Sequence, residues 1–256
     1  MIHPLAQVAE SAEISSGAKI GPGVVVGENA VIGPGSVLGA HALIGKNTFL
    51  GKNNRIFPFA CVGEDPQDKK YQGEESWLQI GDGNTIREFV TINRGTGAGG
   101  GTTRLGNGNW IMAYCHIAHD CQVGNGTVFA NHATLAGHVS VEDGAVLGGF
   151  AAVHQFCRIG QLAMVGAGSL VFKDVPPFFL CAEPRARPHG INLVGLKRQG
   201  FSTLEIMAVR RAYRILYRQG LSFEEASLRI ASLAAEVSAL EPLARFLRTS
   251  RRGVIR

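Results

Sequence analysis

An aliphatic residue or Phe recurs at every sixth position along most of this 256-residue chain. Three runs carry 26 such positions, none of them polar: Ile2 to Val62, Ile80 to Ile92, and Leu105 to Val171. Glycine directly follows 13 of them. A helix repeats about every 3.6 residues and an alternating strand about every 2, so neither produces this period. The pattern predicts a hexapeptide β-solenoid, in which each hexad supplies one short strand and one corner.

Three hexads would close one triangular coil, with the aliphatic side chain inward and Gly at the crowded corner after it. Residues 18 apart should then stack on successive coils, with parallel strands about 4.8 Å apart. No coil can bury its core alone, so stacking must supply the stability. The period itself leaves the handedness open, although general rules favour right-handed crossovers.

The repeat breaks twice, and we expect a loop at each break. Charged, turn-forming residues from about 63 to 79 predict the first loop, and a glycine-rich segment from about 93 to 104 predicts the second. We assign residues 1–184 to the solenoid and residues 185–256 to a helical domain.

Ser202 and Ser222 each precede a Glu by three residues, a capping-box pattern that opens a helix. A third short helix is expected over about 241–248, and the first helix carries an apolar stripe of Leu204, Met207, Ala208, Ala212, Ile215 and Leu216.

Composition bears on compartment and partners. Five scattered cysteines without a CxxC pair favour reduced thiols in a cytoplasmic protein. The repeat begins at the first residues, which leaves no room for a signal peptide, and no apolar run approaches the length of a membrane span. Residues 1–184 hold 11 Lys and Arg against 15 Asp and Glu, whereas residues 185–256 hold 14 against 5. The basic residues of this segment could form a surface for an anionic partner, or they could simply be the solvated faces of helices. We find no nucleic-acid motif.

Histidines gather where the repeat is unbroken. Five of the eight lie between residues 116 and 154: His116, His119, His132, His138 and His154. By the 18-residue rule one column holds His119, Gly137 and Gln155, and the next holds Asp120, His138 and Phe156. We therefore expect His119, Gly137 and His138 to cluster on one face, with Gln155 two coils away.

Several interpretations of this cluster stay open. The histidines could be solvated surface groups on a non-catalytic scaffold. A zinc site between subunits would need three converging imidazoles, which the stacking rule does not obviously supply. In acid–base catalysis, one histidine would take a proton from a hydroxyl or amine, an acceptor such as Asp120 would orient it, and a glycine N–H would stabilise an oxyanion. A covalent route through Cys115 or Cys121, which flank the cluster, is a further alternative.

Six motifs distributed over the whole length add a resemblance: Ile86-Arg87-Glu88, Thr91-Ile92-Asn93-Arg94-Gly95-Thr96, His116-Ile117-Ala118-His119-Asp120, Leu135-Ala136-Gly137-His138-Val139, Val153-His154-Gln155-Phe156-Cys157 and Gly195-Leu196-Lys197-Arg198. Together they resemble the UDP-N-acetylglucosamine O-acyltransferases that begin lipid A biosynthesis in Gram-negative bacteria. The resemblance implies an all-β, left-handed parallel β-helix with an α-helical C-terminus.

It also implies a homotrimer with active sites between subunits, and neither a cofactor nor a metal. The implied reaction transfers an (R)-3-hydroxyacyl group from acyl carrier protein to the glucosamine 3-hydroxyl of UDP-N-acetylglucosamine. His119 would be the general base, with no acyl-enzyme. Asp120 would hold its imidazole, and the N–H of Gly137 would meet the oxyanion.

Other positions are implied as substrate contacts: Asp68, Lys70, His116, His138, His154, Gln155, Asn192 and Arg198. Ala167 lies where a small residue is thought to limit the acyl groove of the family, so a bulkier side chain should shorten the accepted chain. The basic C-terminal segment would suit the acidic carrier protein. The chain departs from the usual family pattern at Asn93, Val194 and Gln199.

Overall fold

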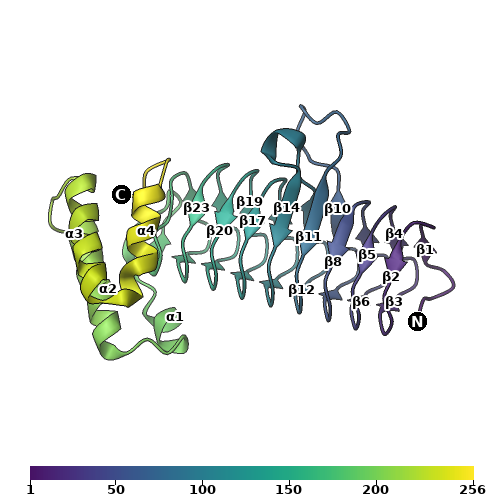
Figure 1. Cartoon of the computed structure of the whole chain (residues 1–256), viewed down its shortest axis with the longest axis horizontal. Coiled ribbons are helices and arrows are strands. Elements are labelled where there is room, and N and C mark those ends of the chain that lie inside the picture. The colour runs from purple at the N-terminus through teal and green to yellow at the C-terminus, as the bar shows by residue number, and fades with distance from the viewer.

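The computed structural model describes all 256 residues as a three-sided prism of short strands with helices at its C-terminal end (Figure 1). The first sheet is parallel throughout and contains β1 (Gln7–Val8), β4 (Val25–Val26), β7 (Leu43–Ile44), β10 (Cys61–Glu64), β13 (Thr91–Asn93), β16 (His116–Ile117), β19 (Thr134–Leu135), β22 (Ala152–Val153) and β25 (Leu170–Val171). The second, also parallel, contains β2 (Glu13–Ile14), β5 (Val31–Ile32), β8 (Thr48–Leu50), β11 (Trp77–Ile80), β14 (Thr102–Leu105), β17 (Gln122–Val123), β20 (Ser140–Val141) and β23 (Arg158–Ile159).

The third sheet contains β3 (Lys19–Ile20), β6 (Val37–Leu38), β9 (Arg55–Ile56), β12 (Thr85–Ile86), β15 (Trp110–Ile111), β18 (Val128–Phe129), β21 (Val146–Leu147), β24 (Met164–Val165), β26 (Phe179–Ala182) and β27 (Arg187–Ile191). Only its last pair, β26 with β27, is antiparallel. The chain thus visits the three sheets in turn, and each round is one coil.

The predicted 18-residue stacking is confirmed in the unbroken part of the repeat. His116 pairs with Thr134, and Thr134 with Ala152. From Ile20 to Val171 every aliphatic or Phe position of the period is at most 4 % exposed, so these side chains form one continuous core. Ile2 is 49 % exposed, because no earlier coil covers it.

The prism has three edges, which we name by their residues. The loop edge joins the first sheet to the second and carries both loops. The glycine edge joins the second sheet to the third, and its turns include Gly83, Gly108, Gly126 and Leu162, all with positive φ. The aromatic edge joins the third sheet to the first and carries a stack of rings whose centroids lie 4.5 to 5.4 Å apart: His41, Phe59, Phe89, Tyr114, His132 and Phe150.

Both loops leave the prism at the loop edge but are shorter than the sequence suggested. Strands β10 and β11 extend to Glu64 and from Trp77, which leaves residues 65–76 as the first loop. The second loop covers residues 94–101 and contains the 3-10 helix η1 (Gly97–Gly99). The guanidinium of Arg94, almost fully buried, donates to the carbonyl of Gly63 and pairs with the carboxylate of Asp65, so it fastens the base of the first loop.

The C-terminal segment forms α1 (Leu193–Arg198), α2 (Thr203–Tyr217), α3 (Phe223–Glu236), η2 (Ser238–Leu240) and α4 (Glu241–Thr249). Both predicted capping boxes are present, at Ser202 and Ser222. The boundary expected after residue 184 falls inside the β26–β27 hairpin, so the third sheet continues to Ile191, and the division into two domains stays a prediction. The longest helix has 15 residues, and none combines the length and hydropathy needed to cross a bilayer.

One detail of the helical prediction is wrong. Leu204 and Met207, assigned to the apolar stripe of the first helix, are 77 % and 60 % exposed. The other four residues of the predicted stripe, Ala208, Ala212, Ile215 and Leu216, are buried, and the buried face of α2 also includes Ile206, Val209 and Tyr213, which pack against the other helices and the end of the prism. Leu204 and Met207 therefore lie on the part of α2 that faces solvent, outside its buried stripe.

Candidate active site

The centre of the candidate site lies on the loop edge, in the turn that follows β16. His119 Nδ1 is 2.8 Å from Asp120 Oδ2. Asp120 adopts the left-handed conformation (φ 60°), and its side chain turns back under the imidazole. Asp120 is 4 % exposed, and its N–H donates to Thr103 Oγ1 at 2.7 Å. A buried carboxylate beside Nδ1 favours the tautomer in which Nδ1 carries the proton and Nε2 is free to accept one.

Gly137 lies one coil beyond His119, as the stacking rule predicted. A Cβ added to Gly137 would come within 2.5 Å of His119 Cε1 and 2.7 Å of Nε2, so the imidazole occupies the space that the absent side chain leaves. The N–H of Gly137 donates no hydrogen bond within the chain. The residue that packs against the imidazole therefore also has a free backbone donor.

His138 completes the predicted cluster. Its ring meets that of His119 edge to face, with centroids 5.1 Å apart, and stacks on Phe156 at 4.5 Å. His138 Nε2 lies 3.7 Å from Asp120 Oδ2. Potential ligand atoms of His119, Asp120 and His138 lie within 4.8 Å of one another, so two imidazoles and a carboxylate converge, rather than three imidazoles. Both oxygens of Asp120 already accept hydrogen bonds, which disfavours this set as a metal site.

His116 lies on the outward face of β16. Its Nδ1 is 2.7 Å from Thr91 Oγ1 on the neighbouring strand. Burial lowers the pKa of His116 below its ordinary value, and the nearby imidazole of His119 lowers the pKa further. His116 is therefore neutral at pH 7 and can exchange hydrogen bonds with a polar ligand.

His154 and Gln155 lie further toward the C-terminal end of the same edge. His154 Nδ1 is 3.4 Å from a guanidinium nitrogen of Arg252, in the tail that follows α4. Gln155 is exposed, and the N–H of Phe156 beside it donates to the carbonyl of Gly137. The loop edge thus presents a row of polar side chains from His119 toward the helices.

The remaining predicted site residues do not all lie near this row of polar side chains on the loop edge. Asp68 and Lys70 lie in the first loop, where Asp68 Oδ1 accepts from the Lys70 N–H. Asn192 and Arg198 border α1, which Figure 1 shows at the opposite edge of the molecule from the loops. Ala167 is exposed at the aromatic edge. Within one chain, Asn192, Arg198 and Ala167 therefore lie away from His119.

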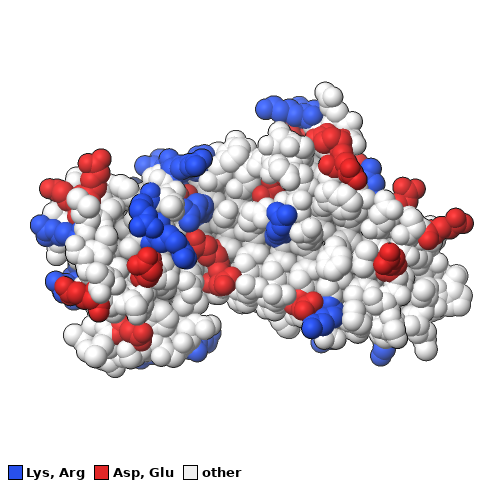
Figure 2. Space-filling model, in the orientation of Figure 1, with Lys and Arg blue, Asp and Glu red and all other residues white.

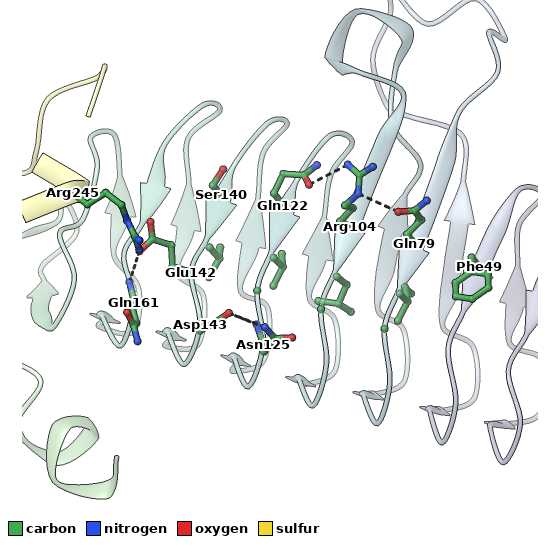
Figure 3. A pocket seen from close by; sticks show the side chains of 17 residues that line it. Phe49, Gln79, Arg104, Gln122, Asn125, Ser140, Glu142, Asp143, Gln161 and Arg245 are labelled. Atoms are coloured by element: carbon green, nitrogen blue, oxygen red, sulfur yellow. Dashed lines mark hydrogen bonds between the residues drawn. The ribbon is translucent and has the colours of Figure 1, made fainter. Parts of the chain in front are cut away.

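A cavity of about 900 Å³ lies elsewhere, on the outer face of the second sheet beside α4 (Figure 3). It contains none of the predicted site residues. Its polar groups bond to one another: Arg104 donates to Gln79 and Gln122, and the N–H of Gln161 donates to Glu142. Since the cavity is lined by no histidine or cysteine that could act as a base or nucleophile, the histidine cluster is the better candidate site.

Sequence reasoning assigned no role to Thr96, which contacts Asp120 through two hydrogen bonds. Thr96 stands in one of the motifs quoted above, but its contact crosses 24 residues and depends on the path of the second loop. No period covers that loop, so only the structure places Thr96 at the site.

Comparison with known proteins agrees with this architecture. Residues 174–255 match the protein-family model described as Udp N-acetylglucosamine O-acyltransferase, domain 2, and residues 23–58 and 102–137 match the bacterial transferase hexapeptide model. The acyl-[acyl-carrier-protein]–UDP-N-acetylglucosamine O-acyltransferase of Thiobacillus denitrificans is 54 % identical over 203 residues, 79 % of each chain.

Solved structures are similar over the full length. The UDP-N-acetylglucosamine acyltransferase of Francisella novicida is 46 % identical with a TM-score of 0.99, covering 100 % of this chain and 94 % of that one. LpxA from Acinetobacter baumannii is 41 % identical with a TM-score of 0.98, covering 100 % and 99 %. These likenesses confirm the predicted fold class, a left-handed parallel β-helix followed by a small helical region. The chain is therefore an acyltransferase and belongs to the UDP-N-acetylglucosamine O-acyltransferase family.

Proposed function

We propose that the protein transfers an (R)-3-hydroxyacyl group from acyl carrier protein to the glucosamine 3-hydroxyl of UDP-N-acetylglucosamine, the first step of lipid A biosynthesis, with His119 as general base. The names of the relatives supply the two substrates. The observation that carries the mechanism is the arrangement of His119, with Asp120 at Nδ1 and Gly137, whose N–H is free, against the Nε2 side of the ring.

In this mechanism Nε2 of His119 accepts the proton of the sugar 3-hydroxyl as its oxygen attacks the thioester carbonyl. The carbonyl oxygen becomes an oxyanion, which the N–H of Gly137 stabilises. The tetrahedral intermediate then expels the thiolate of the carrier protein, which takes the proton back from the imidazolium. Asp120 holds the ring and stabilises its positive charge.

The state of the cysteines supports direct transfer without an acyl-enzyme. Cys115 and Cys121, which flank the cluster, are 1 % and 0 % exposed. Burial raises the pKa of Cys115 to about 11 and that of Cys121 to about 12. Their thiols point toward backbone carbonyls of Ala130 and Ala136. A protonated, buried thiol is a poor nucleophile.

We propose that the active form is a homotrimer with the three aromatic edges at its axis. Phe59, Tyr114 and Phe150 on this edge are 50 to 66 % exposed, an extended apolar strip that an isolated chain would leave in water. The sheet faces on either side of it carry few charges: Glu64, at the loop-edge end of β10, is the one charged outward residue of the first sheet from Val25 to Leu170, and the third sheet has none from Thr85 to Met164. A head-to-tail ring would pack the first sheet of one subunit against the third sheet of the next.

This arrangement would complete the site with residues of the neighbouring subunit. The glycine edge of one subunit would come next to the loop edge of another. Asn192 is fixed to the glycine edge, where its Nδ2 donates to the carbonyl of Leu162 at 2.9 Å. Asn192 and Arg198 of one subunit would then meet Asp68, Lys70, His116, His138, His154 and Gln155 of the next around the nucleotide sugar. The acyl chain would lie in the groove between subunits, with Ala167 at its inner end.

The basic C-terminal surface supports acyl carrier protein as the acyl donor. Figure 2 shows Lys and Arg side chains gathered over α4 and the chain end beside it. Arg245, Arg248, Arg251 and Arg252 there are all exposed. A surface of this sign attracts an acidic protein. We place the reaction in the cytoplasm, in keeping with five free cysteines.

The test is incubation with UDP-N-acetylglucosamine and a panel of 3-hydroxyacyl carrier proteins, with products identified by mass spectrometry. We expect an O-acylated nucleotide sugar from the wild type and none from His119→Ala, with the trimer intact. Full transfer by the variant would disprove the mechanism. Stoichiometric bound zinc, with activity lost to a chelator, would favour the zinc alternative, and no activity with any donor would favour a scaffold.

A further inference from the structure

The carboxylate of Asp120 is held by the second loop as well as by His119. The N–H of Thr96 donates to Asp120 Oδ1 at 2.9 Å, and Thr96 Oγ1 lies 2.7 Å from Asp120 Oδ2. Thr96 is 4 % exposed, so water does not compete for these bonds. With His119 Nδ1 on Oδ2, both oxygens are occupied, and the rotation of the carboxylate is fixed at two points.

The direction of the Thr96 hydroxyl follows from a third contact. The N–H of Gly99 donates to Thr96 Oγ1 at 3.2 Å, since Thr96 is the N-cap of η1. Because that oxygen already accepts a hydrogen bond, its own proton is directed at Asp120. The approach also requires glycine: a Cβ at Gly99 would lie 2.0 to 2.3 Å from the carboxyl atoms of Asp120.

The same loop is tied to the first loop. Glu74 Oε1 accepts from the N–H of Gly97 at 3.1 Å, and Glu74 Oε2 accepts from the N–H of Gln72 at 2.9 Å. These backbone N–H groups keep the pKa of Glu74 below its ordinary value, so the carboxylate stays charged and able to accept both bonds at neutral pH. A continuous series of contacts therefore runs from the first loop through Gly97 and Thr96 to Asp120 and His119.

We propose that Thr96 is a positioning residue for the reaction. It touches neither substrate, but it fixes the carboxylate that in turn sets the tautomer and the plane of the His119 imidazole. This inference rests on the proposed function for its kinetic consequence. The structural consequence, the state of the His119 ring, can be measured without any acyl transfer.

The test compares Thr96→Val, Thr96→Ser and Thr127→Val with the wild type. Valine keeps the shape and the backbone N–H but removes the hydroxyl, whereas serine keeps both donors. Thr127 is the matched control: it is fully buried, and its Oγ1 donates to Asn109 Oδ1 at 2.6 Å on the glycine edge, away from the site. Each protein is labelled with [15N]histidine, the ring signals of His119 are assigned with His119→Gln, and kcat and KM are measured in the transfer assay.

For Thr96→Val we expect kcat to fall on the order of tenfold with KM little changed, as the loss of a hydrogen bond to a charged group predicts. The His119 signals should change from one protonated and one unprotonated nitrogen toward the average of two exchanging tautomers. Thr96→Ser should retain the wild-type pattern and rate. Thr127→Val should lose thermal stability but keep the His119 signals.

Unchanged His119 signals together with an unchanged kcat in Thr96→Val would overturn the inference. So would equal losses in Thr96→Ser and Thr96→Val, because serine keeps the hydrogen bonds and only packing would then explain the effect. If the wild type transfers no acyl group, the proposed function fails. The nitrogen signals then still show whether Thr96 sets the state of His119.

Discussion

At the scale of single residues, the absence of a side chain at Gly137 matters as much as the presence of the imidazole. We expect Gly137→Ala to lower kcat by about 100-fold or more, because the new methyl group would displace the His119 ring, and misplacement by about 1 Å costs that much. The transfer assay measures this loss, and the thermal unfolding temperature should stay near that of the wild type.

Gly149 offers a matched control for that substitution. It occupies the equivalent turn position on the aromatic edge, where the nearest atom to an added Cβ is the carbonyl oxygen of Asn131, at 3.3 Å. Gly149→Ala should therefore keep most of the activity. Equal loss of activity in both variants would show that the turn, not the contact with His119, requires glycine.

His116 should make stability depend on pH in a defined direction. Its pKa is lowered in the folded protein, so between its ordinary value of 6.5 and the lower folded value the unfolded chain binds more protons. The free energy of unfolding contributed by this residue therefore falls as pH falls through that window. We expect the difference in unfolding temperature between about pH 7.5 and about pH 5.5 to be smaller in His116→Gln than in the wild type.

His3 is the corresponding control. It is exposed near the start of the chain, so His3→Gln should leave the pH dependence of unfolding as it is in the wild type. If His116→Gln and His3→Gln have the same pH dependence, burial of His116 is not the cause.

At the scale of elements, the turns of the glycine edge enclose a ladder of polar side chains that stack like the strands themselves. Its members are 0 to 1 % exposed: Ser36, Asn54, Asn84, Asn109 and Thr127. Asn84 Nδ2 donates to Asn54 Oδ1 at 3.0 Å, and Asn84 Oδ1 accepts from Asn109 Nδ2 at 2.9 Å. Each side chain forms hydrogen bonds with ladder residues on the adjacent coils. The ladder therefore holds the turns of successive coils in register.

Asn84→Ala should lower the free energy of unfolding by about 3 kcal/mol, since it leaves the N–H and Nδ2 of buried Asn109 without their acceptor. Asn125→Ala, in the exposed row of the same edge, should cost less than about 1 kcal/mol. Chemical denaturation followed by circular dichroism distinguishes the two. Similar losses would mean that burial does not decide the contribution of these ladders.

The sequence predicted those elements that obey the period. Inward side chains, stacking columns and the neighbourhood of His119, Gly137 and His138 all follow from counting residues. The period says nothing about contacts that cross a break, such as Glu74 with Gly97 or Thr96 with Asp120. Helix α1 was missed because its six residues are too few to show an apolar stripe. Asn192 and Ala167 came from family resemblance, and in a single chain no count of residues could bring them to His119.

At the scale of the whole molecule, the exposed aromatic edge predicts that the chain is not stable as a monomer in water. Phe89→Glu should abolish the proposed trimer, because it would place three carboxylates near one axis and interrupt the stack between Phe59 and Tyr114. Sedimentation velocity measures the change in mass. Phe49 is 50 % exposed, against 43 % for Phe89, but it lies on the outer face of the second sheet, outside the proposed interface, so Phe49→Glu should form the same oligomer as the wild type. Trimers in both variants would rule out the aromatic edge as the axis.

The two ends of the prism are finished differently. At the N-terminal end β1, β2 and β3 are the outermost strands of their sheets. At the other end the last coil is covered: Leu170 pairs with Arg185, Asp174 pairs with Val254 of the returning tail, and Val254 and Ile255 of that tail are buried against the prism. A stack of identical prisms can grow into a fibre only if the head of one accepts the tail of another. Covering one end of the prism is therefore sufficient to prevent end-to-end association of these molecules into a fibre. The residues after α4 provide that cover.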